Sequence, residues 1–381
     1  MNNNYSIWEK SSFFSGYDVL IIGSGIVGLS AAIHLKVGDP KLKIGIIERG
    51  LLPNGASTKN AGFACFGSVS ELLAQLKTSS ENDLKTIVEM RWQGLELLKN
   101  LCGDDLKYEN CGGFELFFNQ KKNEFENCES QIDYLNTLLS DVIGNTDIYS
   151  VCNAKVKESG FAGVENCIKN KYEGHIDSGA MMLSLIKKAS GLGVILLNGF
   201  EIVKFETKSK IINLISFNNE IFESRKILVA TNAFAFQLLP ELEIKPGRGQ
   251  ILVTKPISNL KINGTFHLDK GYTYFRNVGN RILLGGARNL DFENEETYEN
   301  GINEQIHNSL ISLLKGNLLP NQNIEIDYSW SGIMGFGKEL LPEIREVRPN
   351  VFSAVRCNGM GVAMGSLSGK LAAELILKSD F

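Results

Sequence analysis

Residues 17–36 decide the fold, and they read YDVLIIGSGIVGLSAAIHLK. An apolar strand runs directly into Gly23, Gly25 and Gly28, and an alanine-rich helix follows without a break. In this spacing the first glycine permits a tight turn, the second lets a pyrophosphate approach the backbone, and the third lets the helix pack on the strand. The unpaired N–H groups at the helix N-terminus favour the negative charge of phosphate. The pattern therefore predicts a dinucleotide-binding unit.

A second strand supports the same interpretation. Residues 42–47 form a predominantly apolar run that ends in Glu48, which lies 20 residues beyond Gly28. An acid at this distance holds the ribose hydroxyl groups of the adenosine in such units. A glycine-rich turn in an ordinary α/β core is the alternative, but it does not require the strand, the helix and the acid together. We expect the cofactor-binding residues here to be Gly23, Ser24, Gly25, Ile26, Gly28, Glu48 and Arg49.

The composition restricts the class of protein. The chain has 381 residues, 43% hydrophobic and 22% charged, and a net charge of −4, which is too small to imply a polyanionic or membrane partner. The N-terminus lacks the basic start and apolar run of a signal peptide, and no long uninterrupted apolar stretch predicts a transmembrane segment. The seven cysteines include no Cys-x-x-Cys pair, and the four histidines show no ligand spacing. We expect a cytoplasmic protein with reduced thiols and no metal site.

The order of the predicted elements indicates an α/β fold with a discontinuous cofactor domain. Between residues 248 and 288 the hydrophobic period is two, which predicts strands at 249–254, 272–276 and 281–286 and hence an antiparallel sheet. The chain then returns to the nucleotide-binding pattern, with a strand at 351–355 and a helix to about residue 377. We expect a Rossmann-like cofactor domain made of residues 15–80, 172–245 and 325–381, with an inserted α+β substrate domain made of residues 81–171 and 246–324.

The last helix bears on which dinucleotide is bound. Gly361, Gly365 and Gly369 recur at four-residue steps, although each glycine costs about 1 kcal/mol relative to alanine in a helix. Close approach of a ligand or tight packing on the sheet would offset this cost, and the sequence leaves both open. NAD enzymes seldom need a site completed by the final fifty residues, so these features favour FAD.

Several motifs, in this order along the chain, resemble those of the D-amino-acid oxidase-like flavoprotein superfamily, which includes glycine oxidase, sarcosine oxidase and γ-glutamylputrescine oxidase. They lie between Asp18 and Ile376 at 55–62 (GASTKNAG), 174–177 (GHID), 230–233 (ATNA), 246–250 (PGRGQ), 274–276 (YFR), 281–286 (RILLGG), 330–332 (WSG), 341–342 (LP) and 359–362 (GMGV). Arginine usually stands in the family where Lys59 stands here, and Ile202 is expected to touch adenine through its backbone. The resemblance implies further FAD contacts from Ser57, Lys59, Asn60, Ala61, Gly62, Ile202, Ala230, Thr231, Gly332, Gly359, Met360, Gly361 and Val362.

The resemblance also implies the reaction. Members of the family remove a hydride from the carbon beside an amine and pass it to the flavin, so the protein positions the substrate and stabilises the charge of the reduced flavin. Backbone N–H groups at 359–362 can stabilise that charge, and no acid–base residue is indispensable. Relatives with covalent flavin use a cysteine near the Trp-x-Gly motif, where this chain has none, so we expect noncovalent FAD. The lysine with which those relatives activate oxygen is matched by Leu283, which leaves oxygen or a quinone open as the electron acceptor.

Substrate recognition departs from the family pattern. Amino-acid oxidising relatives clamp the substrate carboxylate with an arginine after Trp-x-Gly, whereas the matching residue here is Met334. A primary or secondary amine such as an N-substituted amino acid or a polyamine derivative is therefore favoured over a simple α-amino acid. Strand alternation puts Tyr274 and Arg276 beside the pocket, where Arg276 either replaces the clamp or is an exposed strand-end residue. Arg356 either adds charge near the flavin or forms a salt bridge on a loop. We predict Tyr274, Arg276 and Arg356 as the catalytic residues.

Two other functions stay open. Related flavin domains oxidise the side chain of a modified wobble uridine in tRNA, which requires a basic approach surface. Lysine pairs at 121–122 and 187–188 are as easily solvated helix faces, and the mild net acidity disfavours a nucleic-acid partner. A redox-silent FAD-binding module is the other alternative, but the intact cofactor motifs and the full substrate domain argue against it.

Overall fold

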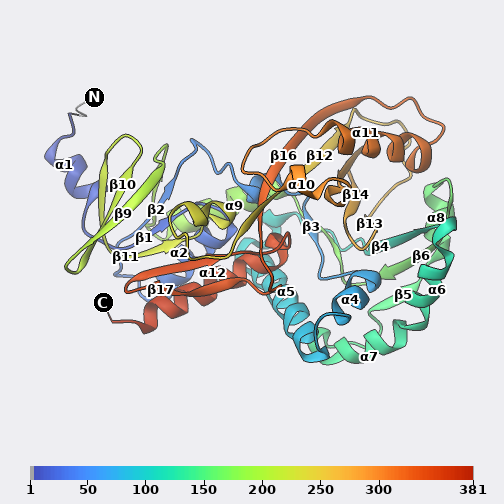
Figure 1. Ribbon diagram of the computed structural model, residues 1–381, viewed down its shortest axis with the longest axis horizontal. Helices are drawn as coiled ribbons and strands as arrows, with labels where there is room; N and C mark the ends of the chain where they lie inside the picture. The colour runs from blue at the N-terminus through green and yellow to red at the C-terminus, as the bar shows by residue number, and fades with distance from the viewer. Residues whose placement is uncertain (1–3, 381) are drawn as a thin grey trace.

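A predominantly parallel sheet forms the centre of the first lobe in the computed structural model, which describes residues 4–380 (Figure 1). Its order is β17-β18-β11-β1-β2-β8, and only β17 pairs antiparallel to its neighbour along this path. Sheets of this kind are covered on both faces, so their central strands are continuous apolar runs, and β2 is buried along its whole length. The strand bounds are β1 Tyr17–Ile22, β2 Ile44–Glu48, β8 Ile195–Asn198, β11 Ile221–Val229, β17 Glu343–Arg348 and β18 Val351–Val355.

One face of this sheet is covered by α2 (Ile26–Gly38), α9 (Ser178–Gly191) and α12 (Gly361–Lys378), which share one apolar core with the strands. Helices α2 and α12 are in close contact, and the glycines of α12 explain why. A Cβ atom at Gly369 would lie 2.4 Å from the carbonyl oxygen of Val27, and one at Gly365 would lie 3.0 Å from the Ile26 side chain. The sequence left ligand approach and packing on the sheet open as explanations for the glycine repeat. These two positions show close packing, but the packing partner is helix α2 and not the sheet.

The opposite face carries a second layer of strands. β9 (Ile202–Lys208) and β10 (Ile211–Ser216) form an antiparallel extension of β11, and their apolar side chains pack with the other face of the central strands. Among residues 4–380, no helix combines the length and the apolar character needed to cross a lipid bilayer.

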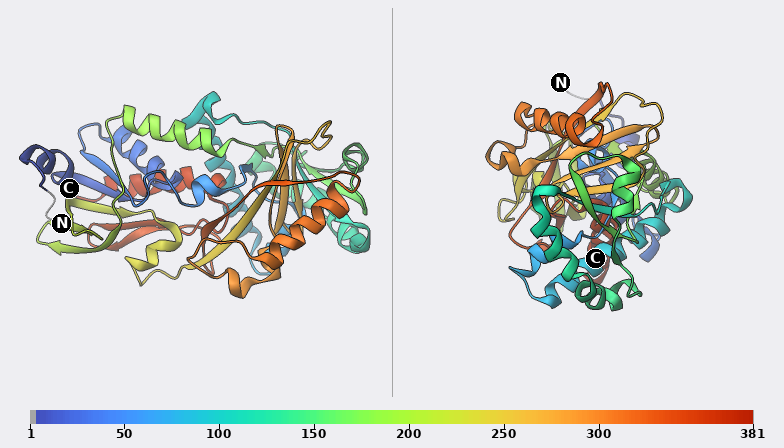
Figure 2. Two further views of the ribbon diagram at one scale, coloured as in Figure 1. Left: turned by 90° about the horizontal axis from the view of Figure 1, so that it is seen from above. Right: turned by 90° about the vertical axis from the view of Figure 1, so that its right-hand side faces the viewer.

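A second, eight-stranded sheet forms the other lobe, in the order β16-β12-β15-β14-β13-β4-β6-β5. All its neighbours pair antiparallel except β13 and β4, which are parallel. The two lobes lie side by side along the long axis of the molecule (Figure 2). The bounds are β4 Gly113–Phe118, β5 Tyr149–Val151, β6 Val164–Asn170, β12 Lys245–Thr254, β13 Thr265–Leu268, β14 Thr273–Val278, β15 Arg281–Gly286 and β16 Ile326–Phe336.

Helices cover this sheet unevenly and leave part of one face directed at the first lobe. The core of the outer face includes Ile306 and Leu310 of α11 (Glu304–Leu313) and Val156 of α8 (Asn153–Ser159). A separate core joins the strands β4, β5 and β6 to four helices. Those helices are α4 Val69–Leu76, α5 Glu81–Cys102, α6 Lys122–Ser130 and α7 Ile132–Ile143.

Helices α4 and α5 are separate because Ser80 begins a new helix. Its hydroxyl accepts from the N–H of Asp83, whose carboxylate accepts from the N–H of Ser80, a reciprocal cap that fixes the start of α5. Strand β16 also differs from expectation. It spans residues 326–336 and pairs with β12 along most of its length, so the second sheet continues past residue 324, where the predicted substrate domain ends. The predicted domain bounds themselves stay a prediction.

Candidate active site

The turn between β1 and α2 has the geometry of a phosphate cradle. Gly23 has φ +106°, which L side chains rarely adopt, and a Cβ atom at Gly28 would lie 2.0 Å from the carbonyl oxygen of Gly23. Gly25 is the N-cap of α2, and the N–H of Ile26 in the first turn donates to the hydroxyl of Ser57 at 3.0 Å. The turn therefore brings together helix N–H groups and a hydroxyl, which suit a pyrophosphate.

Glu48 is the last residue of strand β2 and lies beside this turn. Its carboxylate is buried and accepts from the N–H and the hydroxyl of Ser24 at 3.1 and 2.8 Å, and from the N–H of Gly50 at 3.0 Å. The main chain of Phe200 donates to the carbonyl oxygen of Glu48 at 3.1 Å, which brings Ile202, two residues further on, to the same edge. The acid that is expected to bind the ribose and the expected adenine contact thus lie on adjoining segments.

Three further predicted contacts lie around the turn. The guanidinium of Arg49 is exposed and lies 4.0 Å from the centre of the Phe234 ring. Ala230 follows β11, and its N–H donates to the carbonyl oxygen of Ile22. The Thr231 hydroxyl is buried without a hydrogen-bond partner in the described chain, although such groups are normally paired. A Cβ atom at Gly23 would lie 3.4 Å from the Thr231 side chain, so this hydroxyl is close to the cradle. An unsatisfied hydroxyl at this place fits a dinucleotide that supplies the missing partner.

The loop from Ser57 to Gly62 crosses from the first lobe to the second. Asn60 fixes its shape: the amide nitrogen donates to the carbonyl oxygen of Ser57 at 2.7 Å, and the amide oxygen accepts from the N–H of Gly62 at 2.8 Å. Arg276 of β14 fixes its end, because Nε donates to the carbonyl oxygen of Ala61 at 2.6 Å. Its Nη2 donates to the carbonyl oxygen of Ile176 at 3.0 Å.

These contacts rule out an exposed strand-end Arg276, whereas its role as a replacement for the clamp stays a prediction. The side chain is buried, not exposed at a strand end, and its guanidinium is directed at main-chain carbonyl oxygens. Burial lowers the pKa of Arg276 to about 10, and no carboxylate among residues 4–380 forms an ion pair with it. Arg276 therefore holds the end of the loop that is expected to bind the flavin.

An apolar wall joins the end of this loop to the second sheet. We use this name for one packed cluster of seven side chains: Ala61, Phe63, Ile251, Val253, Tyr274, Leu283 and Trp330. Tyr274 meets Phe63 edge-on, with ring centres 5.4 Å apart. The indole N–H of Trp330 donates to the carbonyl oxygen of Lys59 at 3.0 Å. A Cβ atom at Gly332 would lie 2.9 Å from the Lys59 side chain, so the loop and the wall are in direct contact.

The start of α12 completes the site. Gly359 has φ +83°, Met360 is the N-cap, and Gly361 and Val362 form the first turn. A Cβ atom at Gly359 would lie 3.8 Å from the sulfur of Met334 and 3.8 Å from the Phe336 ring. The helix N-terminus therefore lies against the end of β16, where its free N–H groups can stabilise negative charge.

Arg356 lies just before this turn but points away from it. Its Nη2 is 3.2 Å from the carboxylate of Glu339, and its Nη1 is 3.7 Å from that of Glu343. The same Nη2 donates to the carbonyl oxygen of Leu341 at 3.4 Å. These contacts favour the salt-bridge interpretation, and a direct role of Arg356 in the reaction stays untested.

A buried polar cluster beside the wall was not predicted from the sequence. His267 of β13 lies opposite Tyr274 in the sheet and meets the Phe63 ring edge-on. Its Nε2 is 3.3 Å from the carboxylate of Glu173, whose other oxygen accepts from the N–H groups of Phe66 and Gly67 at 3.0 and 3.1 Å. Burial alone would lower the pKa of His267, but Glu173 outweighs it and the pKa is raised. This cluster was missed because the sequence pattern did not reveal the short strand at residues 265–268, which carries His267.

The raised pKa gives a signed prediction for stability. A group whose pKa is higher in the folded than in the unfolded state contributes its full stabilisation of the fold at pH values below its unfolded-state pKa, which is about 6.5 for histidine. This contribution is lost as the pH rises through the folded-state pKa. We expect His267→Gln to lower the free energy of unfolding by about 2 kcal/mol at pH 6, and by less at pH 9. Urea denaturation of both proteins across this range measures the difference.

His34 provides a control of opposite sign. Burial lowers its pKa, so the wild type should lose stability relative to His34→Gln as the pH falls below about 6.5. A His267→Gln difference that is independent of pH, or that grows toward pH 9, would contradict the assignment of a charged His267.

The fold and the site together define a flavin-nucleotide-binding oxidoreductase. Residues 18–375 match the family model described as FAD dependent oxidoreductase, DAO, and the chain therefore belongs to this family. FAD is thus the cofactor, and the predicted resemblance and fold class are confirmed.

Similar proteins include the "Probable oxidoreductase OrdL" of Haemophilus influenzae, 23% identical over 95% of this chain and 83% of that protein. The glycine oxidase of Geobacillus kaustophilus is 22% identical over 96% of this chain and 94% of its own. Among solved structures, the L-proline dehydrogenase from P. horikoshii covers 97% of this chain and 95% of its own, with a TM-score of 0.74 and 18% identity. At this identity the structural likeness shows the fold alone.

Proposed function

We propose that the protein oxidises the C–N bond of a primary or secondary amine by hydride transfer to noncovalently bound FAD. Bound FAD supplies the ring that accepts the hydride. The apolar wall carries the proposal, because it offers an amine a dry surface beside the loop from Ser57 to Gly62 and includes no carboxylate, imidazole or ammonium group. The similar protein named as glycine oxidase supports an amino substrate.

Each part of the site has a task in this reaction. The cradle at Gly23–Gly28, Glu48 and Thr231 would hold the nucleotide, and the Arg276 contacts would hold the loop with Lys59, Asn60 and Gly62 against it. The wall excludes water from the reacting carbon, and burial raises the pKa of Tyr274 to about 12, which keeps its phenol protonated at neutral pH as a donor. The first N–H groups of α12 would stabilise negative charge.

Reduction of the flavin by substrate tests the proposal. The holoenzyme is mixed anaerobically with a panel of amines, N-substituted amino acids, polyamine derivatives and modified nucleosides, and the flavin absorbance is followed. We expect bleaching by at least one small amine, with dithionite as the control that the bound flavin is reducible. Bleaching only by the modified nucleosides would support the uridine reaction instead, and bleaching by dithionite alone would support a redox-silent module.

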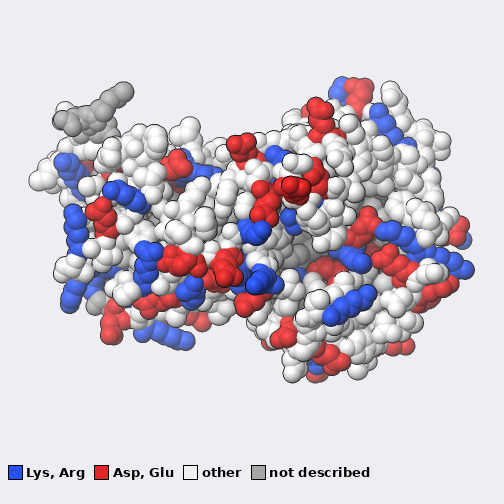
Figure 3. Space-filling view, in the orientation of Figure 1, with Lys and Arg blue, Asp and Glu red and all other residues white. Residues whose placement is uncertain are grey.

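The exposed charges agree with a small-molecule substrate. On the face shown in Figure 3, acidic and basic side chains of the described residues are interspersed and no broad basic surface is visible. Nucleic-acid binding draws on an extended basic patch, so a tRNA substrate is the weaker alternative. The electron acceptor, oxygen or a quinone, and a cytoplasmic location stay part of the proposal.

A further inference from the structure

Arg288 is a half-buried cation beside the proposed substrate site. Its guanidinium lies 4.1 Å from the centre of the Phe336 ring and 4.8 Å from that of Phe292. Within residues 4–380 it makes no hydrogen bond and no ion pair, and burial lowers the pKa of Arg288. Stacking on two aromatic rings holds the planar group in place while leaving its N–H edge available.

The backbone brings this side chain back over the sheet. Gly286 ends β15 with φ +93°, and Ala287 follows with φ +58°, so two successive left-handed residues reverse the chain direction. A Cβ atom at Gly247 of β12 would lie 3.1 Å from Nη1 of Arg288, whereas one at Gly249 would lie 2.8 Å from the Met334 methyl group. Gly247 and Gly249 share one face of the strand, two residues or about 7 Å apart. Arg288 and Met334 therefore lie side by side on the face directed at the start of α12.

The other arginine and lysine side chains around the site already have bonding partners or an expected contact with FAD. Arg276 donates to carbonyl oxygens, and Arg356 pairs with Glu339 and Glu343. Arg281, at the opposite end of β15, pairs with Asp327. Arg248 forms a two-bond ion pair with Glu295 at 2.7 and 3.0 Å. Lys59 belongs to the loop that is expected to contact FAD.

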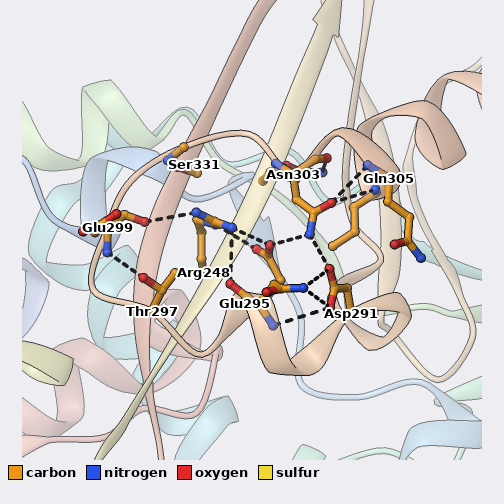
Figure 4. Close-up of polar contacts among 12 residues, drawn as sticks. Arg248, Asp291, Glu295, Thr297, Glu299, Asn303, Gln305 and Ser331 are labelled. Carbon is orange, nitrogen blue, oxygen red and sulfur yellow. Dashed lines mark hydrogen bonds and ion pairs between the residues drawn. The ribbon is translucent and has the colours of Figure 1, made fainter.

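The chain segment that carries Arg288 is itself held firmly. Figure 4 shows Arg248 and Glu295 bonded to each other, with Asn303 donating to Glu295 at 3.0 Å and to Asp291 at 2.8 Å. Asn303 thus ties the two ends of the segment 291–303 together, and Glu295 ties the segment to Arg248 of strand β12. Arg288, immediately before it, is thus presented on an anchored support and not on a loose loop.

We propose that Arg288 binds the anionic group of the substrate, in place of the arginine that Met334 replaces. The substrate is then an amine that carries a carboxylate, and the carboxylate lies displaced along β12 from the position that Met334 occupies. A guanidinium binds a carboxylate through two parallel hydrogen bonds, which fixes both the charge and the orientation of the ligand. This inference rests on the proposed amine oxidation for the identity of the reacting group, but the anion site can be tested without turnover.

The test uses redox-inert ligands and the flavin absorbance of the holoenzyme. Benzoate and its neutral isostere benzamide are titrated into the wild type, Arg288→Gln, Arg288→Lys and the matched control Arg281→Gln, with FAD content and melting temperature measured for each. We expect Arg288→Gln to weaken benzoate by about 50-fold and benzamide by less than threefold. Arg288→Lys should recover part of the affinity, because it restores the charge without the two-pronged geometry, and Arg281→Gln should have no effect.

Several results would overturn the inference. The first is an Arg288→Gln variant that loses affinity for benzoate and benzamide equally. The second is an Arg288→Gln variant that binds benzoate as tightly as the wild type. The third is a wild type whose flavin spectrum responds to none of acetate, butyrate and benzoate. If Arg288→Gln fails to retain FAD, the wild-type preference for benzoate over benzamide and the weaker binding by Arg288→Lys decide the question. A protein that binds benzoate through Arg288 but is bleached by no amine would refute the proposed function and leave the anion site standing.

Discussion

Gly28→Ala is expected to yield a folded but nearly colourless protein. The added methyl group would lie 2.0 Å from the carbonyl oxygen of Gly23 and 3.2 Å from the Ile21 side chain. The nearest atom belongs to the backbone, so no side-chain rotation relieves the clash, and the turn that forms the phosphate cradle must move. Overpacking of this kind costs about 3 kcal/mol, which corresponds to roughly a 100-fold loss of FAD affinity. The bound fraction is measured from the ratio of flavin to protein absorbance after gel filtration, and by titration with FAD.

The matched control for this variant is Gly191→Ala. Gly191 is the last residue of α9 in the same lobe, no atom lies within 4 Å of the position of its Cβ, and its φ is not in the positive range. This control should keep its colour. A Gly28→Ala protein with full FAD occupancy would mean that the β1–α2 turn does not hold the nucleotide, whereas loss of the far-ultraviolet circular dichroism signal would show that folding, not binding, was damaged.

The cradle was predictable because its determinants are local. Strand β1, the glycine turn and α2 are consecutive, and Glu48 follows from the length of one βαβ crossover, so a single stretch of sequence specifies their arrangement. The position of β16 was not predictable in this way. Its pairing with β12 joins residues about 80 positions apart, and nothing in the local pattern of 326–336 distinguishes one sheet from the other.

The arginines show the same limit at the level of side chains. Residue type and strand alternation placed Arg276 near the flavin loop, but its partners are carbonyl oxygens of Ala61 and Ile176, which the sequence cannot connect to it. Arg356 and Arg248 are likewise defined by carboxylates that only the fold brings near. Arg288 was missed because its surroundings come from Gly247, Phe292 and Phe336, three separate segments. A long-range contact has no signature in one sequence.

Glu295→Ala is the second change with a large expected effect, because it removes one partner of a buried ion pair. The Glu295 side chain is 1% exposed and that of Arg248 is 14% exposed, so the variant leaves an almost buried guanidinium without its carboxylate. Breaking such a pair costs about 3–5 kcal/mol. The neighbouring Glu296→Ala is a matched control: Glu296 also pairs with a cation, Lys245, but both side chains are largely exposed, so it should cost less than about 1 kcal/mol.

Urea denaturation of the two single variants and of the double variant Arg248→Met/Glu295→Leu separates the cost of an orphaned charge from the loss of the pair. The double variant should recover most of the lost stability, since apolar residues of similar volume replace buried ion pairs with little penalty. Benzoate titration adds a second readout, because the Arg248–Glu295 bonds anchor the segment that follows Arg288. Equal destabilisation by Glu295→Ala and Glu296→Ala would show that this pair is no stronger than a surface contact. Glu295→Ala that weakens benzoate while Glu296→Ala does not would instead tie the anchored segment to the anion site, since the two carboxylates are adjacent in the chain and differ mainly in burial.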